Sequence, residues 1–245
     1  MANNLLSSSV DLYAAEGRLS VHRSSFDHVE PNARLVIVGI TPGAQQRDLA
    51  NAAFAQATGR GLSCADASRA AKVAASFGGT MRNNLVAMLD HSGAARMLRI
   101  SSTALLFDPA TRGLAHFTSA LRYPVFIDGE NYNGQVPMLG SLLLRSMVES
   151  LLADEVRQLP HAVWQPLGDK PAGALHHLAD LGLIDRARIA PPLPHPSGAN
   201  AERITYFLGR KQAERLSTKT NAAKIDSLRN ASQLFYAKRT NDGWA

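Results

Sequence analysis

Two short loops, far apart in the chain, contain the residues whose types and spacing could do chemistry. The later loop reads His195-Pro196-Ser197-Gly198-Ala199-Asn200 and stands directly before a helical pattern. An imidazole N–H stabilises an oxygen atom most strongly when negative charge develops on that atom during a reaction. The Ser197 hydroxyl or backbone N–H can bind a phosphate oxygen at the N-terminus of the following helix. The loop therefore suits a reaction in which an anion departs from a phosphate-containing substrate.

The earlier loop supplies backbone groups more than reactive side chains. It reads Gly39-Ile40-Thr41-Pro42-Gly43 and follows the apolar run 35–38. Gly39 and Gly43 allow the chain to approach a ligand closely, and Pro42 restricts the turn. Taken alone, each loop has an ordinary alternative. The first would be a simple strand-to-helix turn, and the second a proline-rich turn in which Ser197 or Asn200 caps the next helix.

The elements that must position these loops alternate between strand and helix patterns. We expect strands at 34–38, 103–107, 115–119, 162–166 and 188–191. We expect helices near 10–15 and at 48–58, 65–76, 81–89, 139–153, 169–180, 201–216 and 220–238, with a loop at 128–137. Such alternation predicts a three-layer α/β/α fold with a short central parallel sheet. Because both loops follow a strand, they can converge at the carboxyl ends of the strands, where ligands bind in such sheets.

Composition narrows the class of protein. A length of 245 residues suits one α/β domain, which we place at 1–245 with a core at about 34–216 and a basic helical tail at 220–245. The net charge of +6 favours polyanionic partners. Cys64 is the single cysteine, which excludes an internal disulfide and a cysteine-rich metal site. No apolar stretch approaches the roughly 20 residues of a membrane span, and no signal sequence is evident, so we expect a cytoplasmic protein.

Together, and in this order, the two loops resemble the two active-site motifs of the uracil-DNA glycosylase superfamily. Gln165-Pro166-Leu167-Gly168, before a helix start, is similar to that superfamily's third strand and glycine turn. The resemblance covers roughly residues 34–210. It implies a monofunctional DNA glycosylase, a monomer that hydrolyses the N-glycosidic bond of a flipped-out base in single- or double-stranded DNA and leaves an abasic site. It implies no cofactor and no metal. No lysine lies in either motif, so Schiff-base lyase chemistry is not indicated.

The resemblance also assigns roles to individual residues. His195 would stabilise the departing base, while Thr41 and the backbone around it would place the attacking water. The base pocket would be formed by Ile40, Pro42, Gly43, Phe77, Ser119 and Asn131. The loop against the DNA phosphates would contain Ser197, Gly198, Ala199, Asn200 and Arg203. Ordinary alternatives stay open for three of these residues: a core role for Phe77, turn chemistry for Asn131 and a solvated helix face for Arg203.

Thr41 departs from the superfamily pattern, because most relatives have Asp, Asn or Glu at this position. A threonine hydroxyl can hold a water molecule, but it accepts a proton poorly and carries no charge to oppose an oxocarbenium ion. Three interpretations follow. Thr41 and backbone carbonyls position the water; or another carboxylate, such as Asp48, Asp128 or Glu130, assists; or the protein binds modified or damaged DNA without cleaving it.

Ser119 is a second departure, since it occupies or adjoins the position of a base-reading Asn in many relatives. A smaller side chain weakens the two-point recognition of a pyrimidine edge and leaves more room. We therefore expect a divergent bacterial member that excises uracil or, by hypothesis, a damaged, mismatched or bulky modified base, such as a hypermodified phage cytosine. Both a DNA-repair role and an antiviral role fit this hypothesis. A small-molecule hydrolase on a generic doubly wound sheet is a further alternative.

Overall fold

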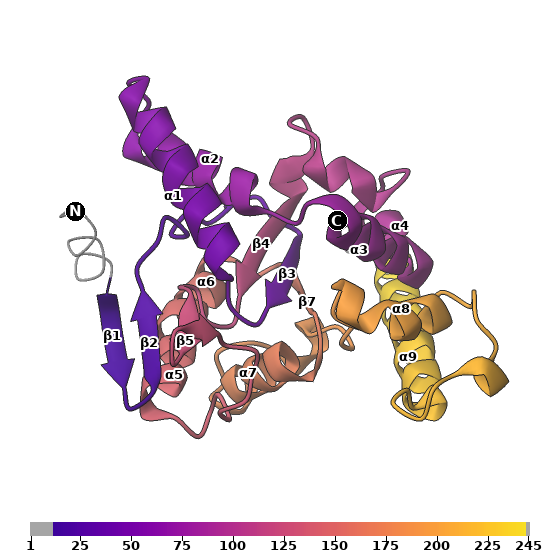
Figure 1. Cartoon of the computed structure of the whole chain (residues 1–245). Helices are drawn as coiled ribbons and strands as arrows, with labels where there is room; N and C mark the ends of the chain where they lie inside the picture. The colour runs from indigo at the N-terminus through magenta and orange to yellow at the C-terminus, as the bar shows by residue number, and fades with distance from the viewer. Residues whose placement is uncertain (1–11, 244–245) are drawn as a thin grey trace.

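A short parallel sheet lies at the centre of the molecule (Figure 1). The structure is a computed structural model and describes residues 12–243. The sheet contains β3 (Leu35–Gly39), β4 (Ala115–Ser119) and β7 (Val163–Pro166) in the order β4-β3-β7, all parallel. The apolar run of β3 is buried on both sides, as expected for a central strand in a sheet covered by helices.

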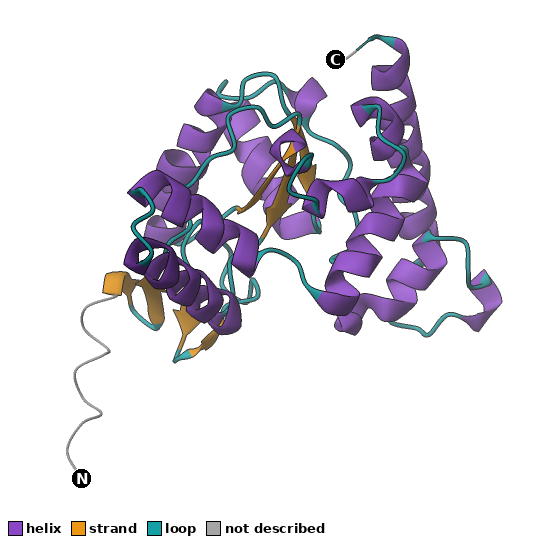
Figure 2. Cartoon of the chain, turned by 90° about the horizontal axis from the view of Figure 1, so that it is seen from above, coloured by secondary structure: helices purple, strands orange, loops and turns teal. Residues whose placement is uncertain are grey.

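Helices cover both faces of this sheet, and the alternating residues of β3 separate the two layers. Leu35 and Ile37 share a core cluster with residues of α3 (Gly79–Ser92), α4 (Ala94–Leu98), α8 (Ala201–Phe207) and α9 (Ala222–Asn241). Val36 and Val38 share another with residues of α5 (Leu142–Met147), α6 (Ala153–Gln158) and α7 (Asp169–Asp180). A π-helical turn at Val148–Leu152 joins α5 to α6. The view from above shows the strands between helices (Figure 2), and the predicted three-layer α/β/α fold is confirmed.

Two further units flank the central layers. A four-stranded antiparallel sheet has the order β1-β2-β5-β6 and contains β1 (Leu12–Glu16), β2 (Leu19–His22), β5 (Val125–Ile127) and β6 (Glu130–Asn131). Helices α1 (Ala44–Gly59) and α2 (Cys64–Ala75) pack against each other as a hairpin. Short 3₁₀ turns occupy Thr103–Phe107, Arg112–Leu114, Arg186–Arg188, Gly198–Asn200 and Ala213–Arg215. The antiparallel sheet was not expected from the sequence.

Two predicted elements were wrong in type. The segment 103–107, expected as a strand, is a 3₁₀ turn, because the Asp90 carboxylate accepts hydrogen bonds from the Thr103 backbone N–H and hydroxyl, both at 2.7 Å. The segment expected as a helix near 10–15 is a strand from Leu12, where the chain pairs with β2; residues 10 and 11 lie outside the described residues. In both cases a hydrogen-bonding partner outside the segment overrides a weak local pattern: Asp90 for the first, and the neighbouring strand β2 of the same hairpin for the second.

Two other elements are shorter than predicted. The helix expected at 201–216 ends at Phe207, and Gly209 has a φ of +70° that turns the chain. The carboxylate of Glu202 then accepts hydrogen bonds from Lys211, Ser217 and Thr220, which fold the following segment back. The strand expected at 188–191 is reduced to two parallel bridges, Trp164 with Ile189 and Leu167 with Leu193.

Core residues also come from outside the segment 34–216. Leu19 and Val21 of β2 are buried in the first cluster, and Ile225 and Tyr236 of α9 in the second. The Tyr236 hydroxyl donates a hydrogen bond to Gln165 Oε1 at 2.8 Å, so α9 is anchored to β7 of the parallel sheet. Within residues 12–243, no helix combines the length and the hydropathy that a membrane crossing requires.

Candidate active site

The two loops identified in the sequence meet at the carboxyl ends of the strands. β3 ends at Gly39, which pairs in register with Ser119 at the end of β4. The second loop follows the segment that bridges to Leu167 through Leu193, next to β7. A cavity of about 430 Å³ lies between the loops, and residues of both line it. The predicted site residues in its lining are Ile40, Thr41, Pro42, Gly43, Phe77, Ser119, Asn131, His195, Ser197 and Asn200.

His195 is held with one ring nitrogen available to the cavity. The backbone N–H of Ser197 donates to His195 Nδ1 at 3.3 Å, so Nδ1 acts as the acceptor and the proton belongs on Nε2. Burial lowers the pKa of His195 below its ordinary value of 6.5. The imidazole is therefore neutral at pH 7, and Nε2–H is a hydrogen-bond donor beside the cavity.

Side chains from neighbouring helices fix the second loop. Asn84 on α3 donates from Nδ2 to the Pro196 carbonyl oxygen at 2.9 Å, directly after His195. Asn200 donates to Ser197 Oγ at 3.3 Å, and Arg203 donates to Asn200 Oδ1 at 3.0 Å. Sequence analysis missed Asn84, because the contact joins residues 112 positions apart. The tip of the loop, Gly198 and Ala199, is exposed and lies outside the cavity lining.

The Thr41 hydroxyl is engaged mainly in hydrogen bonds within the protein. Its Oγ1 donates to the Tyr123 carbonyl oxygen at 3.0 Å and accepts from the Val125 N–H at 3.1 Å. A hydroxyl has one donor and two acceptor lone pairs, so one lone pair is left for a water molecule. Thr41 thus joins the first loop to the chain between β4 and β5, and it is a position that can hold a water without taking its proton.

The carboxylates considered from the sequence do not reach this cavity. Asp48 is exposed on α1 and pairs with Arg47 at 2.9 Å. Asp128 pairs with Arg18 through its Nε at 2.7 Å, and Glu130 is exposed on β6. Across the described residues, the cavity lining includes no Asp or Glu. Of the three interpretations of Thr41, the assisting carboxylate is therefore the one that lacks a candidate side chain.

The other predicted base-pocket residues differ in which of their groups can still contact a ligand. Asn131 Oδ1 accepts from the Ala44 N–H at 2.9 Å at the start of α1, so its Nδ2 group remains for a ligand. The Phe77 ring packs edge-to-face on Phe117 with ring centroids 6.0 Å apart, and it is only partly buried. Ser119 faces Gly39 closely: a Cβ at Gly39 would lie 3.4 Å from Ser119 Oγ.

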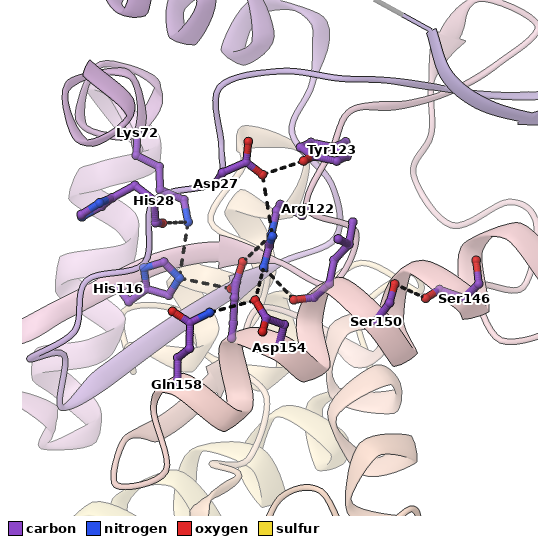
Figure 3. A network of polar contacts seen from close by, with 12 residues as sticks. Asp27, His28, Lys72, His116, Arg122, Tyr123, Ser146, Ser150, Asp154 and Gln158 are labelled. Carbon is purple, nitrogen blue, oxygen red and sulfur yellow. Dashed lines mark hydrogen bonds and ion pairs between the residues drawn. The ribbon is translucent and has the colours of Figure 1, made fainter. Parts of the chain in front are cut away.

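Two cations that sequence analysis did not single out also line the cavity. Lys72 on α2 and Arg122 after β4 belong to a buried polar network with His116 and Glu155 (Figure 3). Glu155 accepts from Arg122 Nε at 2.8 Å and pairs with His116 Nε2 at 3.1 Å. Burial lowers the pKa of Lys72 to about 8, although Glu155 opposes this shift. A sequence signal existed, since Lys72 lies directly after Ala71 on a helix whose small residues Ala67, Ala71 and Ala75 recur at the spacing of one buried face.

A second hollow of about 390 Å³ lies on the other side of the His195 loop. It shares Ile40, His195 and Asn200 with the cavity. Its lining contains four cationic side chains, Lys170, Arg203, Lys219 and Lys224. Lys224 pairs with Asp169 at 2.6 Å, which is also in the lining. The predicted phosphate contact Arg203 is therefore part of a positively charged groove that leads to the cavity.

Comparisons with known proteins agree with this geometry. Residues 26–221 match the family described as the uracil DNA glycosylase superfamily. The chain is 32% identical over 214 residues to the uncharacterized protein YoxB of Bacillus subtilis (strain 168), a match that covers 86% of this chain and 83% of YoxB. No solved structure gives a significant match. Membership supports a DNA glycosylase-like function that includes DNA binding. The chain belongs to the uracil DNA glycosylase superfamily.

Proposed function

We propose that this protein is a monofunctional DNA glycosylase that hydrolyses the N-glycosidic bond of a flipped-out, modified or damaged base. One observation carries the proposal. The neutral His195, with Nε2–H as donor, and the Thr41 loop line the same cavity at the carboxyl ends of the strands. Base excision requires a donor for the departing base and a place for water, and this cavity offers both.

In the proposed reaction, His195 donates from Nε2–H to an oxygen of the base as negative charge develops there. Water is held by the remaining lone pair of Thr41 and by backbone carbonyls of the first loop, and it attacks the sugar carbon as that carbon becomes oxocarbenium-like. Asn131 offers its Nδ2 group to the base and Phe77 offers a ring face. Since the described residues of the lining include no carboxylate, the reaction would depend chiefly on stabilising the departing base.

The DNA would bind across the loop that carries His195. Ser197 and Arg203 lie on either side of this loop, one in the cavity lining and the other in the cationic groove. Phosphate contacts of this kind position a strand without reading its sequence. Base identity would then be tested inside the cavity.

A second candidate is a protein that binds modified DNA without cleaving it. It is favoured by the cavity lining, which contains no carboxylate among the described residues, and by the structural hydrogen bonds of Thr41. Both candidates use the same cavity and groove, and they differ only in whether the base is released.

A panel of oligonucleotides separates the two candidates. Purified protein is incubated with DNA that contains uracil, mismatched, oxidised or phage-type modified bases, in single- and double-stranded form, and abasic sites are counted after alkaline cleavage. We expect abasic sites with at least one modified base. His195→Ala should lower the single-turnover rate by about 10²- to 10³-fold, the cost of one preorganised donor, and leave DNA affinity nearly unchanged. Binding without any abasic product establishes the non-catalytic candidate.

A further inference from the structure

Lys72 lies where two hollows meet. Only 8% of Lys72 is exposed, yet it lines both the 430 Å³ cavity and a smaller hollow of about 70 Å³ between α2 and β4. Ser76 and Phe117 also line both hollows. Lys72 therefore borders space that a bound base, or a substituent on that base, can enter.

The Lys72 ammonium has more donors than the protein accepts. One N–H donates to the His28 carbonyl oxygen at 2.6 Å. His116 Nε2 lies 3.4 Å away, but His116 Nδ1 accepts from the Glu30 N–H at 3.4 Å. The proton of His116 therefore belongs on Nε2, which donates to Glu155 and cannot accept from a charged Lys72. Two of the three ammonium donors have no acceptor among the residues that the structure describes.

The carboxylates near Lys72 form hydrogen bonds with other cationic or imidazole side chains. Glu155 bonds Arg122 and His116, and Glu30 bonds Arg69 at 2.8 Å. No described carboxylate forms an ion pair with Lys72. A buried cation is costly unless it is paired, so an unpaired lysine beside an open cavity indicates that the ligand supplies the partner. The hydroxyl of Ser119 lies in the same cavity lining and offers a second hydrogen-bond donor.

We propose that Lys72 is a specificity-determining residue that binds an anionic or strongly hydrogen-bond-accepting substituent on the base. The inference rests on the proposed function, and it names the substrate class of the same cavity: bases with an acidic or carbonyl-type group, in preference to bases with an alkyl group of similar size. Lys72 acts through binding, because it holds the substituent, and His195 keeps the role at the departing base.

The test measures binding, so that it does not depend on cleavage. Oligonucleotides contain one 5-carboxyuracil, 5-formyluracil or 5-methyluracil on a 2′-fluorinated sugar, since fluorine disfavours the oxocarbenium ion and keeps the base in place. Fluorescence anisotropy gives the Kd of each DNA. We expect the wild-type protein to bind the carboxyl DNA about tenfold or more tightly than the methyl DNA, the size of a charge-assisted hydrogen bond, with the formyl DNA between them.

Three variants complete the design. Lys72→Met should bring the carboxyl-to-methyl ratio close to one and leave the Kd for the methyl DNA unchanged, whereas Lys72→Arg should restore most of the preference. Lys238→Met, which removes an exposed charge on α9, should keep the full preference. The proposal is overturned if the wild-type protein shows no preference or if Lys72→Met keeps it. It is equally overturned if Lys72→Met weakens the binding of all three DNAs alike and also lowers the Tm, because that result indicates a structural role for Lys72. Failure of base release on ordinary sugars, with the binding preference intact, contradicts only the proposed cleavage.

Discussion

Replacing Glu155 by Gln should strongly destabilise the fold, because Glu155 is a fully buried carboxylate inside the polar network of Lys72, His116 and Arg122. It is fully buried and accepts from Arg122 Nε and pairs with His116 Nε2. Although burial alone raises its pKa, the charge of Lys72 and the hydrogen bond with His116 hold the pKa of Glu155 at about 2. The folded protein therefore keeps the charged form, and Gln removes that charge while keeping the size.

The size of the expected loss of stability follows from the charged side chains that Glu155→Gln leaves behind. Glu155→Gln leaves the Arg122 guanidinium, 8% exposed, without its closest carboxylate, since the partly exposed Asp27 and Asp154 lie at 3.7 and 3.8 Å. The Lys72 ammonium loses the negative charge that most favours its charged form. Breaking a buried ion pair from one side costs about 3–5 kcal/mol. For a chain of this length, about 2–4 °C of Tm accompanies each kcal/mol, so we expect the Tm to fall by roughly 6–20 °C.

Glu149→Gln is the matched control. Glu149 lies on the same helical run and also pairs with a histidine, His177, at 2.8 Å, but its side chain is 41% exposed. Exposed pairs contribute about 0–1 kcal/mol, so its Tm should stay within a few degrees of wild type. Thermal unfolding at pH 7 by circular dichroism compares the three proteins. Equal Tm values for Glu155→Gln and Glu149→Gln would refute the idea that the network depends on a buried carboxylate.

The other predictions concern the loop, the groove and the pH dependence of stability. Asn84→Ala should lower kcat about tenfold, because the Pro196 carbonyl loses its donor and the His195 loop loosens; Asn83→Ala, an exposed neighbour, should leave kcat unchanged. Arg203→Ala should weaken binding to all DNA sequences alike and reduce the slope of log K against log salt by about 0.9, as measured by anisotropy at several salt concentrations. Burial lowers the pKa of Lys72 from 10.5 to about 8. At pH values between these two pKa values, the unfolded chain therefore binds more protons than the folded protein. The free energy of unfolding should therefore gain from Lys72 as the pH rises from about 8 to 10, and urea titrations of Lys72→Met should lack this gain; equal slopes in both proteins would contradict the shift.

The local sequence was sufficient where a segment's own pattern sets its structure. The β-branched run at 35–38 predicts a buried strand, and Ala115–Ser119 forms the predicted strand with the same bounds. The Ala-rich helix patterns at 48–58 and 65–76 correspond to α1 and α2. Local patterns failed where a partner outside the segment decides its structure: Asp90 turns 103–107 into a 3₁₀ turn, and pairing with the neighbouring strand β2 makes the segment from Leu12 a strand.

The sequence by itself determined the two loops, their order, and their places after strands, because glycine, proline and a single histidine restrict what those segments can do. Only the tertiary structure decided which other groups meet them. Lys72, Arg122 and Glu155 are 33 to 83 positions apart, and no local period connects them. The strands and helices bring these charges together, and burial then sets their protonation states. The cavity thereby has cationic side chains in its lining and, among its described residues, no carboxylate, and it is on these charges that we base the proposal of a substrate base with an acceptor group of its own.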